Sequence, residues 1–411
     1  MSLNEFIITN LAANGLEAGF EGESEFLGTV GTRLSKEFMQ PSLDVGQTIN
    51  EVLPPRPNPW IDGRVINPQA SVYEEVPITV IQSNTSRLIT DAELVLDRKS
   101  FFEDIVKPDV NGGVRNAERA ALLSIMTSYP SMVNIDYVGQ DPTNSQIWSN
   151  TRAKYQMMLG PKNVFGIMNP LTMGLLAENE AKLFRPSETV DVAALKGRVK
   201  ELAGVGNLYD SVNLPTFLTS NTDRVGAVNG AAQTGTSLIT DGWSSGTTFF
   251  KGEQFYFSTA GVGNALDPEI HTENPFKQVF TLSQDCAISG GAATLVFGPS
   301  IIISGSLQDQ LIAPPDNTVI TFIGDANTTY QQHFLYAGGD SGAINFVGLK
   351  LPTFSGRGGE SKVKSYKNVP LRSVYFTDYK DGQNYLRYDK MCGAQTRYWQ
   401  WVWRFWGSKV G

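Results

Sequence analysis

The stretch TTFFKGEQFYFSTAGVG, residues 247–263, is a hairpin-like strand pattern with a glycine turn on each side. The same texture runs from about residue 223 to 325, where short β-branched and aromatic runs alternate with Gly, Asn, Asp and Pro. Such spacing is typical of a small β-barrel or sandwich. Because helical periodicity vanishes in this region, we predict an all-β domain inserted between two halves of an α+β host.

The host begins with the strongest helical pattern, over 89–130, where Thr90 or Asp91 followed by Glu93 favours a helix start. Pro108 and the pair Gly112-Gly113 are expected to kink or interrupt this helix. The next expected elements are helices over 145–160 and 171–184, a buried strand over 163–170 and an edge strand over 207–212. Beyond the insert we expect mixed α/β structure over 328–352 and closing strands to residue 411.

A two-stranded arm is predicted upstream of the helix. Strand-like runs over 44–60 and 71–82 flank a tip near 60–68, and the first run enters a cluster of four prolines. Proline cannot continue a central strand, so this segment is expected to leave the sheet and protrude. Residues 1–43 mix short apolar runs with Gly and Glu, which favours an extended arm with one short helix.

Charge is distributed unevenly along the 411 residues. The whole chain carries −8, so bulk electrostatics do not favour nucleic-acid binding, yet residues 350–411 hold 12 Lys/Arg against 4 Asp/Glu. The first 30 residues contain five glutamates and no Lys or Arg. Acidic and basic ends can attract each other, within one subunit or between neighbours, or can form two separate solvated faces.

Targeting, metal and redox motifs are absent from the sequence. Cys286 and Cys392 form no CxxC pair, and two lone thiols indicate a reducing compartment. The N-terminus lacks the basic and apolar regions of a signal peptide, and no run approaches 18 apolar residues. We expect no metal, no cofactor and no membrane span.

Catalytic patterns are equally scarce. His271 and His333 are the two histidines, and neither follows a G-x-S-x-G elbow. The glycine-rich runs near 290 and 356–359 lack the Lys-Ser/Thr of a phosphate cradle. Asp378, Asp381 and Asp389 are more simply turn and cap residues than paired acid–base groups. The chain is therefore predicted not to be an enzyme.

The run YWQWVWRFW, 398–406, is the densest aromatic segment. Read as one strand, it places Trp399, Trp401, Trp403 and Phe405 on one face. Such rings can stack on sugars or bases. A core or subunit-contact role is favoured, because aromatic side chains dominate packed interfaces.

Four segments follow one another in a specific order: VGQTINEVLPP with EEVPITVIQSNTSRLITDAELVLDRKSFFEDIVKP, then FFKGEQFYFSTAGVGNAL with FKQVFTLSQDCAISGGAATLVFGPSIII, then TYQQHFLYAGGDSGAINFVGLKLP, and last SVYFTDY with LRYDKMCGA. In this order they resemble the major capsid proteins of tailed bacteriophages, and among them the coat-protein family of the Salmonella short-tailed phage, which carries an inserted domain. They span roughly residues 44–395.

The resemblance implies a tailed-phage (Johnson-type) capsid fold with an extended N-arm, a two-stranded extended loop, a long spine helix at about 98–129 and an inserted barrel-like domain. The implied divisions are an N-terminal arm 1–43, an extended loop 44–88, a peripheral domain 89–140 with 351–411, an axial domain 141–222 with 326–350, and an inserted β domain 223–325.

The implied function is a major capsid protein that assembles into hexamers and pentamers of an icosahedral shell around double-stranded DNA, with no catalytic activity. The implied partners are further copies of the chain, a scaffolding protein, a portal protein and non-specifically contacted DNA. The implied location is the virion, assembled in the host bacterial cytoplasm.

Two groups of residues are candidates for these contacts. By the family's acidic-coat and basic-scaffold pairing, the N-terminal glutamates would receive a basic scaffold helix: Glu5, Glu17, Glu21, Glu23 and Glu25. Expected contacts between subunits are Pro54, Pro57, Trp60, Arg64, Asp241 and Trp401. The family's charged inter-capsomer loop is expected near 226–247, where this sequence offers only Asp241, so that contact differs here or is absent.

Two other interpretations stay open. A tail, decoration or fibre-associated virion protein would explain the β content and the missing catalytic motifs, but not the long helix followed by α/β segments. A carbohydrate-binding or hydrolytic protein would use the aromatic residues of 398–406 and the nearby aspartates, and would lose sugar binding on Trp401→Ala.

Overall fold

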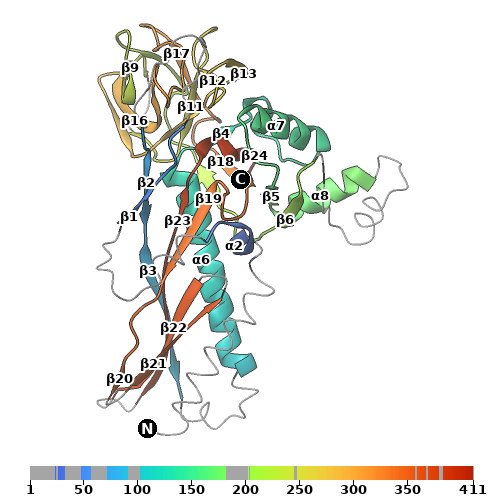
Figure 1. The fold of residues 1–411 in the computed structure, drawn as a ribbon, viewed down its shortest axis with the longest axis vertical. Helices are drawn as coiled ribbons and strands as arrows, with labels where there is room; N and C mark the ends of the chain where they lie inside the picture. Colours follow the sequence, from blue (N-terminus) through green and yellow to red (C-terminus); the bar gives the residue numbers. More distant parts are fainter. Residues whose placement is uncertain are drawn as a thin grey trace, which may run out of the picture. The chain divides into compact units, whose positions relative to one another are not determined.

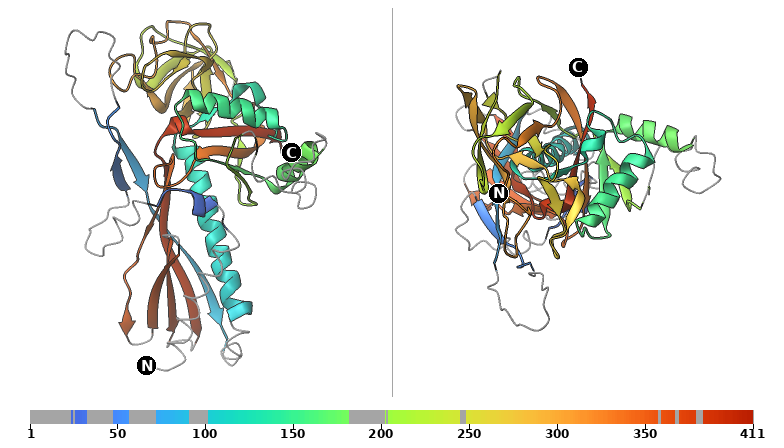
Figure 2. Two further views of the ribbon diagram at one scale, coloured as in Figure 1. Left: turned by 45° about the vertical axis from the view of Figure 1, so that its right-hand side comes forward. Right: turned by 90° about the horizontal axis from the view of Figure 1, so that it is seen from above.

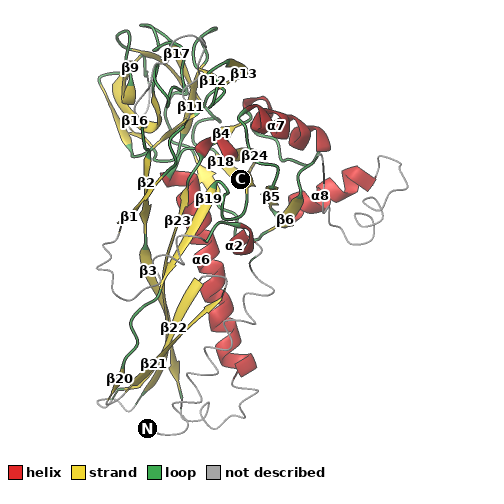
Figure 3. Ribbon diagram, viewed as in Figure 1, coloured by secondary structure: helices red, strands yellow, loops and turns green. Residues whose placement is uncertain are grey.

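The computed structural model describes residues 24, 26–32, 48–56, 72–90, 102–181, 202, 204–244, 248–356, 359–366, 369–378 and 383–410. Strands dominate and helices are few, so the fold is α+β, as predicted (Figure 3). The chain divides into two compact units. The first comprises 1–50, 77–122 and 345–395, and the second comprises 51–76, 123–344 and 396–411.

The first unit is built on an antiparallel sheet. Its strand order is β19-β23-β22-β21-β20, and β3 pairs along β23. The strands are β3 (Ile81–Ile89), β19 (Ile344–Leu349), β20 (Ser355–Gly356), β21 (Gly359–Tyr366), β22 (Val369–Thr377) and β23 (Asn384–Thr396). The predicted closing strands are thus confirmed for this part of the chain.

The long helix α6 (Lys107–Ser128) runs beside these strands (Figures 1 and 2). A π-helical turn, η1 (Phe102–Val106), precedes it, and the short helix α2 (Phe26–Thr29) lies far upstream. Helix α6 buries a stripe at helical spacing that includes Val110, Val114 and Ala117. Arg87 on β3 donates to Asp109 at 3.0 Å, which ties the sheet to the first turn of α6.

The predicted interruption of this helix at Gly112-Gly113 is wrong, because α6 continues through both glycines. Tertiary contacts offset their poor helix propensity: the buried ammonium of Lys390 donates to the carbonyl of Gly113. Pro108 comes just after the π-helical turn η1, so the helical backbone is irregular at the place where proline was expected to kink it. The predicted capping box falls largely outside the described residues, since 91–101 are not described.

The second unit contains a mixed sheet ordered β4-β24-β18-β5-β6, with β7 also pairing β18. Its strands are β4 (Met132–Val133), β5 (Val164–Met168), β6 (Asn207–Asp210), β7 (Thr216–Leu218), β18 (Thr329–Ala337) and β24 (Val402–Lys409). The short turn η2 (Ile135–Tyr137) and the helices α7 (Ser145–Met157) and α8 (Pro170–Ala181) belong to the same unit.

These elements test the predictions for the host. Helices over 145–160 and 171–184, the buried strand over 163–170 and the edge strand near 207–212 are confirmed by α7, α8, β5 and β6. The predicted mixed α/β structure of 328–352 is wrong, because this segment forms only the strands β18 and β19. Its near-continuous apolar run suits strands buried on both faces.

Residues 225–322 form the predicted β domain (Figure 1). Strands β16, β14, β11, β17, β8 and β9 pair in that order, and β9 pairs back onto β16, which closes a six-stranded antiparallel barrel. Strands β15 and β10 extend the sheet from β16, and β12 pairs with β13 alone. The strands are β8 (Val225–Val228), β9 (Gly235–Asp241), β10 (Thr248–Phe249), β11 (Gln254–Phe257), β12 (Asn264–Leu266), β13 (Glu273–Lys277), β14 (Phe280–Leu282), β15 (Cys286–Ser289), β16 (Ala292–Ile301) and β17 (Val319–Phe322).

The stretch 247–263 contributes β10 and β11, which do not pair with each other. Strand β10 pairs with β15, and β11 pairs with β14 and β17, so the hairpin-like interpretation is wrong although the flanking glycine turns exist. Gly252, in the first turn, has φ +88. A Cβ added to Gly252 would stand 2.9 Å from the Cα of Thr127. Both the conformation and the close approach require glycine.

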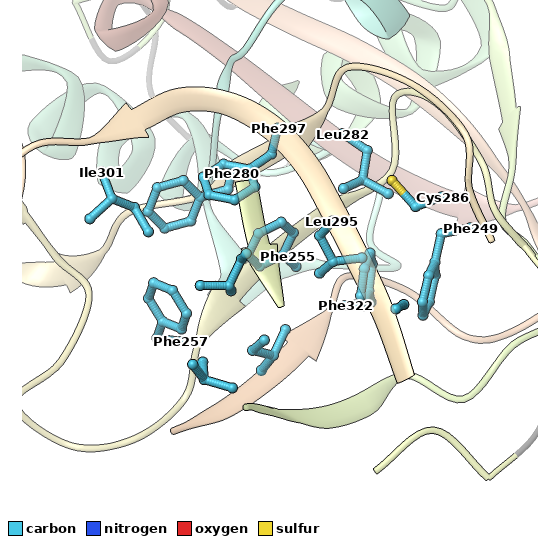
Figure 4. Packing of buried hydrophobic residues seen from close by; sticks show 14 of the residues in the cluster. Phe249, Phe255, Phe257, Phe280, Leu282, Cys286, Leu295, Phe297, Ile301 and Phe322 are labelled. Carbon is cyan, nitrogen blue, oxygen red and sulfur yellow. The ribbon is translucent and has the colours of Figure 1, made fainter. Parts of the chain in front are cut away.

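Aromatic rings fill the barrel (Figure 4). Phe249 stacks on Phe322 with ring centroids 4.3 Å apart, and Phe255 packs against Phe280 and Phe297 at 5.4 and 5.3 Å. Inward residues from all six barrel strands join this cluster. The barrel therefore has a hydrophobic core of its own.

Replacing Phe255 by alanine should lower the free energy of unfolding by about 3–5 kcal/mol, since the ring is fully buried among other rings. Chemical denaturation of the purified chain measures the change. Val319→Ala, on the exposed side of β17, is the matched control and should cost well under 1 kcal/mol. Equal losses in the two variants would contradict a single barrel core at Phe255.

Candidate assembly elements

The predicted two-stranded arm is described at its base, where β1 (Thr48–Val52) pairs with β2 (Glu75–Thr79). After β1, the backbone N–H of Leu53 donates to the carbonyl of Glu74 at 2.8 Å, and the Leu53 side chain is buried. The sequence around the predicted tip, 57–71, lies outside the described residues. The pairing of two strands is therefore confirmed, and the tip stays a prediction.

Ion pairs hold this base on both strands. Arg56 bridges to Glu74 across the strands, with Nη2 and Oε2 3.2 Å apart. Arg397 lies 3.2 Å from Glu51, and both side chains are less than a tenth exposed. With its amide oxygen facing Arg56, Gln400 accepts from the two Nη atoms at 2.9 and 3.1 Å. Both groups of the Glu51–Arg397 pair are buried against each other, so this pair and the bonds from Arg56 to Gln400 anchor the base to residues 397–400.

Next to this anchored base, the arm exposes apolar side chains. Val52 is 54% exposed, Val72 is 47% exposed and Tyr73 is 60% exposed, and Pro54 is also exposed. A two-stranded ribbon is marginally stable alone, and clustered apolar surface marks an interaction site. The described base of the arm is thus held by ion pairs and exposes apolar side chains beside them.

The aromatic segment 398–406 is packed inside the second unit. Trp399–Trp401 form a 3₁₀ turn, η3, and β24 begins at Val402, so the prediction of one alternating strand is wrong. Strand β24 lies between β4 and β18, and Trp403 and Trp406 are fully buried. Trp401 is half-buried, and its indole N–H donates to the carbonyl of Met158 at 3.1 Å. The segment supplies core, and its rings form no open platform.

The acidic residues considered for acid–base chemistry have structural surroundings. In the first unit, the buried Asp389 carboxylate lies 2.6 Å from Arg372 and 2.5 Å from Arg387. Asp378 is half-buried, and Asp381 lies outside the described residues. Asp389 therefore forms ion pairs with two guanidinium groups.

His333 belongs to a buried clasp that sequence reasoning missed. Its Nδ1 accepts from the N–H of Asn169 at 3.3 Å, so Nε2 carries the proton and lies 3.1 Å from Asp141. Ser408 donates its hydroxyl to the same carboxylate at 2.6 Å, not to the histidine. Burial lowers the pKa of His333, while bonds from His333 and Ser408 outweigh burial and lower the pKa of Asp141 to about 2. The group fastens β18, β24 and the residue after β5 to the loop before α7, without an activated serine.

A second buried cluster centres on Arg404 of β24. Its guanidinium donates to Gln332 at 2.6 Å, to the carbonyl of Gly252 at 3.0 Å and to that of Met126 at 3.3 Å. The rings of Phe217 and Trp406 lie 4.7 and 4.6 Å from its central carbon. Burial lowers the pKa of Arg404 to about 9, and nearby Glu253 opposes that shift. One cation thus joins the end of α6, the mixed sheet and the first turn of the barrel.

Neighbouring polar side chains complete this junction. Gln254 of β11 donates to the carbonyl of Ser131 at 3.0 Å and accepts from the indole of Trp406 at 2.9 Å. Glu253 accepts from the backbone N–H of Ser220 and pairs with Arg224 at 3.3 Å. These contacts attach the barrel to the rest of the second unit through satisfied, water-excluded hydrogen bonds.

The predicted inter-subunit residues fall on separate elements. Pro54 follows β1, Asp241 ends β9 and Trp401 ends η3. The other predicted contact residues lie outside the described residues: Glu5, Glu17, Glu21, Glu23, Glu25, Pro57, Trp60 and Arg64. The structure adds three features: the base of the arm, the His333 cluster and the Arg404 junction. The only sequence signal for each was a single charged residue within an apolar run.

Within the described ranges, no group of three or more His, Cys, Asp and Glu side chains is placed to hold a metal ion. No helix in the described part of the chain has the length and apolar character needed to cross a membrane.

Comparisons with known proteins gave likenesses of structure only. No family model matches the sequence, and no curated protein matches it. A chain from Mycobacterium phage Che8 is similar with TM-score 0.43 at 10% identity, covering 92% of this chain and 88% of that chain. The acidic stable capsid of Helicobacter pylori bacteriophage KHP30 gives 0.43 at 9% identity, covering 93% and 91%. The mature capsid of bacteriophage PhiM1 gives 0.40 at 12%, covering 90% and 84%.

Replacing Arg404 by methionine should destabilise the chain by about 3–5 kcal/mol, because the buried oxygens of Gln332, Gly252 and Met126 each lose a hydrogen-bond donor. Denaturant unfolding measures the loss. Lys409→Met, at the exposed end of the same strand, removes the Lys409–Asp325 ion pair and should change little. An Arg404→Met variant as stable as the wild type would contradict the junction.

Proposed function

We propose that this chain is the major capsid protein of a tailed bacteriophage, which assembles into hexamers and pentamers of an icosahedral shell enclosing double-stranded DNA. The observation that carries the proposal is the chain order of four elements: the paired strands β1 and β2, the long helix α6 beside an antiparallel sheet, an α/β part, and a six-stranded barrel. This order is the one implied by the sequence resemblance.

The arm supports the proposal most directly. A monomer gains nothing from exposing Val52, Val72 and Tyr73 on a ribbon whose base is fixed by buried ion pairs. A neighbouring subunit can cover those side chains, so we propose that the arm lies over the next copy. Proposed contacts between copies are Pro54, Pro57, Trp60, Arg64, Asp241 and Trp401.

The roles that we propose for the parts of the chain follow the predicted domain boundaries. Residues 1–43 form an N-terminal arm, 44–88 an extended loop, 89–140 with 351–411 a peripheral domain, 141–222 with 326–350 an axial domain, and 223–325 an inserted domain that stabilises the subunit. Each contact in such a shell is weak, and repetition makes the particle stable.

The proposed partners are further copies of the chain, a scaffolding protein, a portal protein and packaged DNA contacted without sequence preference. Assembly would take place in the bacterial cytoplasm and end in the virion. The proposal includes no catalytic activity and no cofactor.

Expressed alone and with a neighbouring scaffold gene, the chain should form closed shells with scaffold, and shells, tubes or spirals without it. Negative-stain electron microscopy of the lysate fractions checks this outcome. A discrete monomer that never polymerises, even with scaffold present, would contradict the capsid role and redirect attention to sugar binding at Trp401.

Reversing the charge of Glu5, Glu17, Glu21, Glu23 and Glu25 to lysine should abolish scaffold incorporation, because like charges would face a basic scaffold helix. Co-sedimentation of scaffold with assembled particles measures the effect. Reversing Glu269 and Asp316, two exposed carboxylates within residues 225–322, is the matched control and should leave incorporation unchanged. Undiminished scaffold content in the N-terminal variant would contradict this partner site while leaving shell formation as a separate result.

A further inference from the structure

Three polar side chains form a buried chain in the β domain. Gln278, Asp309 and Gln310 are 0%, 7% and 2% exposed. The amide of Gln278 donates from Nε2 to Oδ2 of Asp309 at 3.0 Å and accepts at Oε1 from Nε2 of Gln310 at 2.9 Å. The hydrogen bonds therefore run in one direction, from Gln310 through Gln278 to the carboxylate.

Asp309 also closes the loop that follows β16. Its Oδ1 accepts from the N–H of Ile302 at 2.7 Å, and the N–H groups of Asp309 and Gln310 both donate to the carbonyl of Ile302 at 3.0 and 3.1 Å. The segment around this neck exposes Ile303, Leu311 and Ile312. A change at Asp309 would therefore act at the neck of a loop that presents apolar side chains.

The surroundings of Asp309 permit two states. An ionised carboxylate only accepts hydrogen bonds, which suits the two donors that now face it. A proton on Oδ2 would point at the NH₂ group of Gln278 and could not be satisfied. Turning the Gln278 amide over restores the bond, with Asp309 donating to Oε1, and a matching turn of Gln310 restores the next one. Both states keep every bond within the chain, with its direction reversed.

The charges around the site allow Asp309 to be either ionised or protonated. Burial raises the pKa of Asp309 to about 7, against the bonds from Ile302 and Gln278 and the field of Arg56, which lower it. Arg56 lies at the base of the arm, where it pairs with Glu74. Its charge also lowers the pKa of His271, as burial does, while Asp267 raises it. The Asp309 carboxyl is thus poised between its two forms near neutral pH, with Arg56 the charged group acting on it.

We propose that Asp309, Gln278 and Gln310 form a proton-driven relay, in which a proton taken from water by the Asp309 carboxylate turns both amides over and exchanges donor for acceptor at Gln310. The relay links protonation of the Asp309 carboxylate to the hydrogen bonds between Ile302, Asp309 and Gln310 that close the 302–310 loop. It goes beyond the capsid role and does not depend on it.

Selective ¹⁵N labelling of glutamine side chains in the full chain tests the relay by NMR, with Gln278→Met and Gln310→Met supplying the assignments. On titration from pH 8 to pH 5, the NH₂ resonances of both glutamines should shift together with one midpoint near 7. Movement of Gln278 alone, or a midpoint near the ordinary carboxyl value of 3.8, would overturn the proposal.

Asp309→Asn supplies the matched variant, because an amide at this position offers NH₂ permanently to Gln278 and holds the reversed state. Its glutamine resonances should match those of the wild type at low pH and should not titrate. Asp316→Asn, at an exposed carboxylate of the same domain, should titrate like the wild type. Continued titration of the two amides in Asp309→Asn would overturn the relay.

Stability gives an independent readout. A carboxyl with a raised pKa in the folded state stabilises the fold fully below its unfolded value, and that stability is lost as pH rises towards 7. The unfolding constant of the wild type should rise relative to that of Asp309→Asn by up to about tenfold per pH unit between pH 4 and 7. Parallel curves for the two chains would contradict the burial of a titrating acid at this site.

Discussion

The buried guanidinium of Arg404 is the contact on which the second unit depends. It draws together carbonyls from Met126 and Gly252, the amide of Gln332 and two aromatic rings, from parts of the chain far apart in sequence. Burying such a cation is costly unless its donors find acceptors in good geometry. The acceptors come from α6, β18 and the barrel turn and bond Nε and Nη1, whereas the buried Nη2 has no hydrogen-bond partner among the described residues. These three elements must therefore meet at Arg404 for Nε and Nη1 to be bonded. The junction thus selects one way of attaching the barrel.

The aromatic core stabilises the barrel, and the polar junction determines how the barrel is attached. Phe255, Phe280 and Phe322 stabilise the barrel because folding buries their apolar surface away from water. This effect has no direction, so it does not determine how the barrel is attached to the rest of the second unit. Gln254 has its backbone in the same strand as Phe255, but its side chain bonds Ser131 and Trp406 outside the barrel. Alternation along β11 therefore gives one residue to the core and the next to the junction.

Local patterns were sufficient to predict the barrel and the elements α7, α8, β5 and β6, because period and turn residues are properties of short stretches. Four predictions failed. Helix α6 continues through Gly112 and Gly113, where the buried Lys390 bonds the Gly113 carbonyl. The stretch 247–263 is not a hairpin, 398–406 is a 3₁₀ turn followed by a strand, and 328–352 forms the two strands β18 and β19 without a helix. The partners of these segments lie far away in the sequence, where local patterns do not reach. The His333 clasp, the Arg404 junction and the Gln278 chain could not be predicted, since each pairs polar residues more than 20 positions apart.

The most direct test of this account is a cryo-electron microscopy reconstruction of the particles that the chain forms when it is co-expressed with its scaffold. The account predicts an icosahedral shell in which one subunit conformation, with the Arg404 junction intact, fits both sixfold and fivefold clusters and the arm covers a neighbouring copy. Particles of another symmetry, such as a tail tube or ring, or a shell in which the arm contacts only its own subunit, would contradict it.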